Sequence, residues 1–394
     1  MSGEEYDVVV VGGGPSGATA ADDLARAGRR VLLLDKAGRI KPCGGAIPPR
    51  AIRDFAIPDH LLVGRATSAR MIAPSAEAVD MAIGGFVGMV DRGEFDEWLR
   101  ARAATAGAER RNGMFDRLER DADGRAVIVF RDKAAGGEWR VRARSVIGAD
   151  GARSQVARQS LKGGGRTPCV FAYHEVIRSP GGDGTPGYEP HRADVYYQGA
   201  LSPDFYAWVF PHGDTASIGV GSARKGFALR GSVEALRRKT GLDRCETIRG
   251  EGAPIPLKPL RRWDNGRDVV VAGDAAGVVA PASGEGIYYA MLGGRLAAEA
   301  VDEFLTTGKA RALAGARRRF MRDHGRVFWV LGMMQWFWYS TDKRRERFVR
   351  MCADEDVQRL TWQAYMEKKL VRARPAAHAR IFFKDLGHLF GSMG

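Results

Sequence analysis

The sequence predicts a mixed α/β fold, in which a parallel-sheet domain is interleaved with an antiparallel-sheet domain and followed by a helical region. Three observations predict it. Val8–Val11 is a continuous β-branched run bounded by glycine, which is typical of a strand buried on both faces. Residues 163–260 instead carry short segments that alternate with a period of two and include aromatic residues, which favours an antiparallel sheet. Residues 311–388 have a mainly helical pattern.

The first strand leads into a glycine-rich turn and a helix. Gly12, Gly14 and Gly17 follow it in the spacing G-x-G-x-x-G, and Pro15 has the φ angle that suits the first turn of a helix over 18–27. In this arrangement the first glycine makes the tight turn, the second lets a pyrophosphate approach, and the third lets the helix pack on the strand. The free N–H groups at the helix N-terminus then face the phosphates. The pattern predicts a Rossmann-like dinucleotide site.

A second strand, 30–35, ends in an acidic residue. Asp35 lies 23 positions after Gly12, where a carboxylate accepts hydrogen bonds from an adenosine ribose, and Lys36 follows it. The alternative, a glycine-rich surface turn with a chance acid, does not account for strand, turn, helix, strand and acid appearing in order.

Residues 36–46 form a predicted loop around a cysteine. Two glycines and a proline flank Cys43, which indicates a loop whose backbone comes close to another group. The alternative is a flexible crossover with an incidental thiol. A helix over 91–106 follows, and Arg92 on it, taken alone, is typical of a solvated charge.

Two later stretches complete the first domain. Residues 125–130 and 139–143 predict a β-hairpin whose second strand runs on to 151, and 268–277 repeats the buried strand and tight turn. A helix over 287–305 contains Gly293 and Gly294, where we expect close packing. We therefore expect three units: a discontinuous first domain over 1–62, 84–160 and 265–308, an antiparallel domain over 63–83 and 161–264, and a helical region over 309–394.

The charge balance of the sequence limits the classes of partner that the protein can bind. Lys and Arg exceed Asp and Glu by 14, and residues 309–394 alone hold 19 basic against 8 acidic residues. Such a balance suits nucleic acid, an anionic membrane or an acidic protein. No nucleic-acid motif accompanies it, so we expect no nucleic-acid partner.

The distribution of cysteines and the lack of long apolar runs indicate the cellular compartment. The four cysteines are scattered without metal-ligand spacing, so no metal site is expected. The first residues lack the apolar stretch of a signal peptide, and no run of 18 apolar residues exists. We expect a cytoplasmic protein. An aromatic stripe over 328–339, flanked by arginines and lysines, is open to three interpretations: core, lipid tunnel or membrane-facing surface.

Four separated motifs resemble those of a flavoprotein family. They are the G-x-G-x-x-G turn with its acid, Asp91-Arg92, the run 148–151 and the run 273–276. Over nearly its whole length the chain resembles FAD-dependent geranylgeranyl reductases, above all those of bacteriochlorophyll and chlorophyll biosynthesis. The resemblance implies an FAD domain of the glutathione-reductase and aromatic-hydroxylase type. Beyond the glycine turn and its acid, the resemblance implies further contacts with FAD. They come from Lys36, Cys43, Gly44, Arg92, Asp150, Gly273, Asp274 on the ribityl chain, and Gly284 and Gly286 beneath the isoalloxazine.

Two motifs resemble the prenyl reductases more narrowly. One is the cysteine loop over 41–45, and the other is Y-x-W-x-F-P over 206–211. Tyr206, Trp208 and Phe210 project to one face of a strand, so their rings can wall an apolar slot for an isoprenoid. The alternative is a plain sandwich core.

The resemblance implies reduction of the C=C bonds of a geranylgeranyl chain to the phytyl form. The substrate is a prenyl diphosphate, an esterified pigment, or both. The resemblance implies that hydride comes from reduced FAD, and that Cys43, Tyr206 or a water supplies the proton. It implies NADPH as the transient reductant, while some relatives use ferredoxin-like donors. The runner-up is an FAD monooxygenase that hydroxylates an aromatic or polyene, and a second class is a flavin-free lipid carrier. We also expect peripheral attachment to an anionic photosynthetic membrane, where other pigment-biosynthesis enzymes can be partners.

Overall fold

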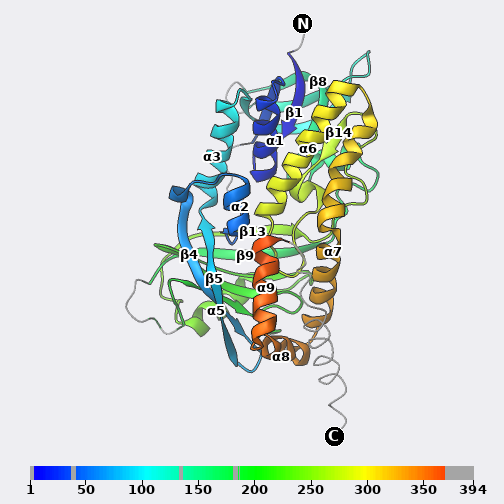
Figure 1. Ribbon diagram of the computed structural model, residues 1–394. Helices are drawn as coiled ribbons and strands as arrows, with labels where there is room; N and C mark the ends of the chain where they lie inside the picture. The colour runs from blue at the N-terminus through cyan, green and yellow to red at the C-terminus, as the bar shows by residue number, and fades with distance from the viewer. Residues whose placement is uncertain (1–3, 37–40, 133–135, 181–184, 186, 369–394) are drawn as a thin grey trace.

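Two β-sheets lie end to end, with long helices along one side (Figure 1). The computed structural model describes residues 4–36, 41–132, 136–180, 185 and 187–368. The predicted mixed α/β class is confirmed, with one mainly parallel and one mainly antiparallel sheet.

The first sheet is built on a parallel core. Its strands in chain order are β1 (Glu5–Val11), β2 (Val31–Asp35), β6 (Glu109–Arg120), β7 (Ala126–Asp132), β8 (Glu138–Gly148) and β14 (Val269–Val271). The parallel order is β6-β2-β1-β8-β14. The long strands β6 and β8 each pair in parallel along one part and antiparallel with β7 along the other, which includes the predicted hairpin.

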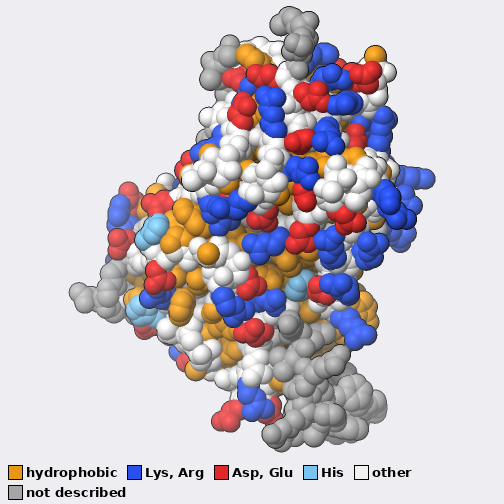
Figure 2. Space-filling view, turned by 45° about the horizontal axis from the view of Figure 1, so that its top comes forward, with side chains coloured by type: hydrophobic (Ala, Val, Ile, Leu, Met, Phe, Trp, Pro, Cys, Tyr) orange, Lys and Arg blue, Asp and Glu red, His pale blue; other side chains and the backbone are white. Residues whose placement is uncertain are grey.

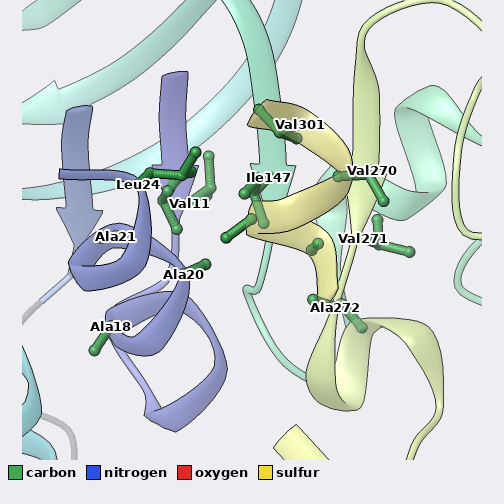
Figure 3. Packing of buried hydrophobic residues seen from close by; sticks show 14 of the residues in the cluster. Val11, Ala18, Ala20, Ala21, Leu24, Ile147, Val270, Val271, Ala272 and Val301 are labelled. Atoms are coloured by element: carbon green, nitrogen blue, oxygen red, sulfur yellow. The ribbon is translucent and has the colours of Figure 1, made fainter. Parts of the chain in front are cut away.

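Three helices cover this sheet: α1 (Pro15–Arg26), α3 (Arg92–Thr105) and α6 (Ile287–Thr307). Small side chains of α1 pack between the strands and α6, with Val11, Ile147 and Val301 around them (Figure 3). A Cβ on Gly294 would lie 2.1 Å from the Ser16 carbonyl oxygen, so only glycine allows this approach of α6 to α1. The close packing predicted at the glycine pair is confirmed, and α6 continues through it.

The second sheet has eight strands in the order β13-β9-β12-β11-β10-β4-β5-β3. All neighbours are antiparallel except the parallel pair β10–β4. Helix α5 (Leu229–Thr240) packs on β9 and β12. The strands are β3 (Ala46–Ile47), β4 (Leu62–Ile72), β5 (Ala78–Val90), β9 (Cys169–Arg178), β10 (Arg192–Tyr196), β11 (Ala207–His212), β12 (Thr215–Ser222) and β13 (Thr247–Pro256).

The domain boundary expected at residue 84 is wrong. β5 runs unbroken to Val90, so residues 84–90 belong to the second sheet, as do residues 46–47 in β3. Gly84 and Gly85 have positive φ angles and interrupt the period-two pattern, although the strand continues beyond them. A glycine-rich stretch of this kind predicts a loop more readily than a bent strand.

The remaining elements are mostly helical. They are α2 (Pro49–Asp54), α4 (Gln155–Ser160), α7 (Gly315–Trp338), α8 (Asp342–Met351), α9 (Glu355–Glu367), and the short 3₁₀ turns η1 (Asp59–Leu61), η2 (Gly273–Ala276) and η3 (Ala310–Ala314). The helical prediction for the C-terminal region is confirmed to residue 368, and residues 369–394 lie outside the described residues. Within the described ranges, no helix combines the length and apolarity that crossing a bilayer requires.

Helix α7 places the aromatic stripe in three different surroundings. Phe328 is buried in the core of the first sheet. Leu331 and Met334 line the main cavity. Trp329 and Trp336 project outward, with exposed fractions of 68% and 75%.

A buried histidine on α7 gives the fold a dependence on pH. His324 is 5% exposed and packs against the rings of Tyr289 and Phe320. Burial, and then Arg50, lowers its pKa to about 4 from the usual 6.5. Between pH 6.5 and pH 4 this histidine is protonated in the unfolded chain but stays neutral in the folded one. The free energy of unfolding therefore decreases as the pH falls from 6.5 to 4, by up to about 3 kcal/mol.

We therefore expect the free energy of unfolding in urea to decline from pH 6.5 to pH 4. His324→Gln should make that decline shallower, whatever its effect at pH 7. An unchanged slope would contradict the assignment of the titration to this ring.

Candidate active site

One cavity of about 1920 Å³ extends from the glycine turn of the first sheet to the aromatic strand of the second. It brings together nearly all the predicted site residues. Those lining it are Gly12, Gly14, Pro15, Asp35, Lys36, Cys43, Gly44, Arg92, Asp150, Tyr206, Trp208, Phe210, Asp274, Gly284 and Gly286. Gly17 and Gly273 lie outside the lining, because each is a packing glycine.

The glycines of the turn have three different roles. Gly12 has φ +108°, and a Cβ there would lie 2.3 Å from the Ala149 carbonyl oxygen. A Cβ on Gly17 would lie 1.8 Å from the Gly12 carbonyl oxygen. A Cβ on Gly14 would meet no protein atom within 4 Å, because it points into the open cavity. The open space at the second glycine is what a bound pyrophosphate requires.

Polar groups around this space fit a dinucleotide. The Asp35 carboxylate accepts a hydrogen bond from the Gly13 N–H at 2.8 Å and lines the cavity at the end of β2. The Ser16 hydroxyl, in the first turn of α1, is buried without a partner among the described residues. A buried hydroxyl without a partner is costly, and a phosphate oxygen would satisfy it at this helix N-terminus. These residues fit the adenosine and pyrophosphate portions of FAD.

The aspartate of the run 273–276 forms an ion pair with a lysine that had no predicted role. Asp274 is buried, and its carboxylate pairs with the Lys41 ammonium. The pair joins η2 to the cysteine loop. A loop lysine carries no local signal that identifies this partner 233 positions away.

Asp150 lines the cavity and also accepts hydrogen bonds from backbone N–H groups. Its carboxylate accepts hydrogen bonds from the Gln155 N–H at 2.6 Å and the Ser154 hydroxyl at 2.5 Å, so it fixes the start of α4. Burial raises the pKa of this carboxyl above its ordinary value. Asp150 therefore stabilises the turn that leads from Gly151 into α4.

Arg92 is not the solvated charge that its local sequence suggests. It is 4% exposed and makes two hydrogen bonds with Asp96, at 2.8 and 2.7 Å. Burial opposes its charge, but Asp96 and Cys43 outweigh that cost and raise the pKa of Arg92. The guanidinium thus stands beside the thiol of Cys43 and stays charged.

The cysteine loop packs directly on the aromatic strand. A Cβ on Gly44 would lie 3.1 Å from the Phe210 ring, and one on Gly45 would lie 2.5 Å from Nε2 of His212. The Gly45 N–H also points to Sγ of Cys43 at 3.4 Å. This loop therefore presents Cys43 at the junction of the cofactor space and the slot between the rings, and it is not a flexible crossover.

Tyr206, Trp208 and Phe210 share one face, as predicted. Their ring centroids are 5.9 Å apart for the first pair and 6.1 Å for the second, while Ala207 and Val209 face the other core. The Tyr206 hydroxyl donates to the Ser283 carbonyl at 2.6 Å, which ties the strand to the loop containing Gly284 and Gly286. Burial, and then Tyr339 and Cys43, raises the pKa of Tyr206, so this phenol is a weaker acid than a free tyrosine.

Two glycines that the sequence analysis missed make room for these rings. A Cβ on Gly219 would lie 2.2 Å from the Trp208 indole, and one on Gly221 would lie 2.6 Å from the Phe205 ring. Both lie on β12, beside β11. The signal was a G-x-G inside an otherwise regular strand, which marks close approach of a neighbouring group.

Gly219→Ala should displace the Trp208 indole and lower the free energy of unfolding by about 1–3 kcal/mol through overpacking. Shrinking the indole in the double variant Gly219→Ala, Trp208→Phe should recover part of that loss. Urea unfolding of both variants and of Trp208→Phe alone measures the coupling. Strict additivity would contradict the contact.

Comparisons with known proteins identify the family of this chain. The family model for pyridine nucleotide-disulphide oxidoreductases matches residues 6–174. The geranylgeranyl diphosphate reductase of Rhodobacter capsulatus is 59% identical over 388 residues, which cover 98% of each chain. The chain belongs to the geranylgeranyl reductase family. The chloroplastic geranylgeranyl diphosphate reductase of Oryza sativa is 37% identical, over 98% of this chain and 87% of its own.

A solved structure shares the geranylgeranyl reductase fold. The geranylgeranyl bacteriochlorophyll reductase-like protein of Thermoplasma acidophilum superposes with a TM-score of 0.82 over 96% of both chains, at 22% identity. That identity supports the fold alone. The FAD-binding type of fold expected from the sequence is confirmed.

Part of the wall of the main cavity is formed by C-terminal elements that had not been predicted to contribute to the site. Trp362 and Tyr365 of α9 line it, and they pack in the same apolar clusters as methionines of β4 and β5. Lys368 follows α9 and forms a buried ion pair with Glu285 at 2.7 Å. These contacts join segments more than 80 positions apart, so no local pattern predicts them.

Proposed function

We propose that this chain reduces the C=C bonds of a geranylgeranyl chain, carried as a diphosphate or as a pigment ester, with NADPH as the reductant. One observation carries the proposal: a slot walled by Tyr206, Trp208 and Phe210 opens into the same cavity as the dinucleotide site. When bound, FAD supplies hydride to an alkene carbon. The residues around it hold the cofactor and exclude water, and they supply the proton.

The slot suits an isoprenoid. Its other walls carry flexible apolar side chains, including Met71, Met81, Met89 and Met334, and methionine adapts to ligands of irregular shape. An isolated alkene has no carbonyl to hold negative charge, so the transition state gains positive charge at the tertiary carbon. Aromatic faces attract such a charge, and exclusion of water prevents hydration.

Cys43 is the better proton donor of the two candidate side chains. The Tyr206 hydrogen is engaged by the Ser283 carbonyl, and burial raises the pKa of this phenol. Cys43 lines the cavity beside the charged Arg92, which would stabilise the thiolate left after proton transfer.

Incubation of the purified protein with geranylgeranyl diphosphate, and separately with the geranylgeranylated pigment, tests the proposal. Each mixture receives NADPH under nitrogen, and the products are weighed by mass spectrometry. We expect two added hydrogens per reduced bond. A product that gains oxygen in air and nothing under nitrogen would instead identify a monooxygenase.

Attachment to an anionic membrane surface is part of the proposal. Trp329, Met333 and Trp336 form an exposed stripe on α7, continuous with Arg322 and Arg326 at the same helical spacing. Lys and Arg side chains are also scattered over the upper half of the face in Figure 2. Aromatic and basic groups together suit the headgroup region of the cytoplasmic leaflet, here that of a photosynthetic membrane.

The double variant Trp329→Ser, Trp336→Ser should lower sedimentation with anionic vesicles about tenfold or more, because two interfacial anchors are lost. High salt should release the wild type as well. Equal binding of wild type to neutral and anionic vesicles at low salt would contradict the electrostatic part.

A further inference from the structure

A second, polar cavity of about 470 Å³ lies against the cysteine loop. Lys41, Pro42, Cys43, Arg92 and His174 line both this cavity, here called the chamber, and the main cavity. These residues therefore form the partition between the two. The chamber differs from the aromatic slot in its walls, which carry Asp91, Glu94, His212, Asp214, Arg249 and Glu251.

The outer wall of the chamber is an ion-pair chain that reaches solvent. Arg249 pairs with Asp91 at 3.0 Å and with Glu251 at 2.7 Å. The side chains of Asp91 and Arg249 are 34% and 32% exposed. Water thus has access to this end of the chamber.

The inner wall holds His174 on β9, which is 4% exposed. The strand register places His174 opposite Gly219 and Gly219 opposite Trp208, so the imidazole and the indole share one face on either side of a residue without a side chain. Ser217 joins them: its hydroxyl lies 3.1 Å from Nε1 of Trp208 and 2.9 Å from Nδ1 of His174.

The hydrogen bonds among Trp208, Ser217 and His174 can be assigned from the groups that donate. An indole N–H only donates, so the Ser217 oxygen accepts from Trp208 and its own hydrogen is available to Nδ1 of His174. Burial, then Arg249 and His212, lowers the pKa of His174 to about 4, which keeps the ring neutral near pH 7. We assign its one hydrogen to Nε2, because Nδ1 then accepts from the Ser217 hydroxyl. Nε2 is buried without a partner in the described part of the chain. In the wall of a polar cavity, an ordered water is the expected partner.

We propose that the chamber is the route by which protons from solvent reach Cys43, with a water held on Nε2 of His174 as the last carrier. The inference rests on the proposed function. Each reduced bond consumes a hydride and a proton, yet the slot must stay dry. When one alkene carbon takes the proton of Cys43, the S–H bond breaks and its electron pair stays on sulfur as thiolate. The other carbon takes the hydride that NADPH supplies as the reductant. The chamber water then protonates the sulfur, and the hydroxide that remains takes a proton from solvent through the chamber. His174 is a positioning residue in this scheme.

Three variants test the chamber. Val176→Phe fills it, because Val176 lines the chamber and not the main cavity. His174→Phe removes the Nε2 donor, and His174→Gln keeps an N–H donor on the side chain. FAD affinity, from quenching of flavin fluorescence, should stay within about threefold of wild type in all three, since His174 and Val176 belong to the second sheet and the glycine turn belongs to the first.

The first readout is labelling of Cys43 by iodoacetamide, with the slot filled by the saturated product and the labelled peptides weighed. We expect wild type to remain reactive through the chamber and Val176→Phe to react about tenfold more slowly, with Cys245 as the internal reference in both. Complete protection of wild-type Cys43 by the product would overturn the proposal, and this outcome does not depend on any variant folding.

The second readout is reoxidation of chemically reduced enzyme by geranylgeranyl diphosphate under nitrogen, in H2O and D2O. His174→Phe and Val176→Phe should be about tenfold slower, with a larger solvent isotope effect, and His174→Gln should stay near wild type. Unchanged rates in both phenylalanine variants would overturn the proposal. If wild type reacts with neither geranylgeranyl diphosphate nor the geranylgeranylated pigment, the proposed function fails, and labelling alone then decides the chamber.

Discussion

Gly14→Val is expected to abolish FAD binding while the fold stays intact. Gly14 has φ −75° and ψ −176°, a conformation that any residue adopts, and its Cβ would meet no protein atom. The valine side chain would instead occupy the space of the pyrophosphate. We expect FAD affinity to fall at least about a hundredfold, or about 2.7 kcal/mol.

Flavin fluorescence and urea unfolding measure the two quantities separately. Gly332→Val on α7 is the matched control, because its Cβ would meet only Pro281 at 3.9 Å. Gly17→Ala provides the contrast: its Cβ would collide with the Gly12 carbonyl, so FAD is lost together with stability. A Gly14→Val protein that remains yellow with wild-type affinity would contradict the placement of the cofactor.

Cys43→Ser is expected to leave FAD bound and to slow turnover about a hundredfold or more, the usual effect of removing a general acid. Serine keeps the size of the side chain and can still accept a hydrogen bond from Arg92. A hydroxyl is a much weaker acid than a thiol, so the loss should fall on the rate and not on substrate affinity.

Cys245→Ser is the matched control, since Cys245 packs beneath the other face of the second sheet. Single-turnover reoxidation of the reduced enzyme, with the Kd for FAD measured alongside, separates chemistry from binding. Near-normal rates in Cys43→Ser would remove the thiol from the mechanism and leave an ordered water as the donor.

Local patterns predicted the parts of the site that form within one supersecondary unit. The turn from Gly12 to Gly17, the acid at Asp35 and the shared face of Tyr206 and Trp208 follow from short-range spacing, because strand alternation and turn sterics act over a few residues. The same reasoning located Gly294, since a glycine pair inside a helix has few uses besides close packing.

Contacts across the fold could not be predicted in this way. Arg92 is buried where α3 meets the cysteine loop beside Cys43, and Lys41 meets Asp274 only after the chain has crossed both sheets. The role of α9 as a cavity wall depends on how the C-terminal helices return over the second sheet (Figure 1). His174 was missed because a single histidine in a strand gives no sign of the cavity behind it.

The most direct measurement is the mass of the product formed under nitrogen by the purified protein, a reductant and geranylgeranyl diphosphate. The structure predicts a product heavier by two hydrogens for every bond reduced, with the reduced flavin reoxidised in step. Unchanged geranylgeranyl diphosphate beside fully reduced flavin, together with unchanged geranylgeranylated pigment in a parallel mixture, would contradict the account.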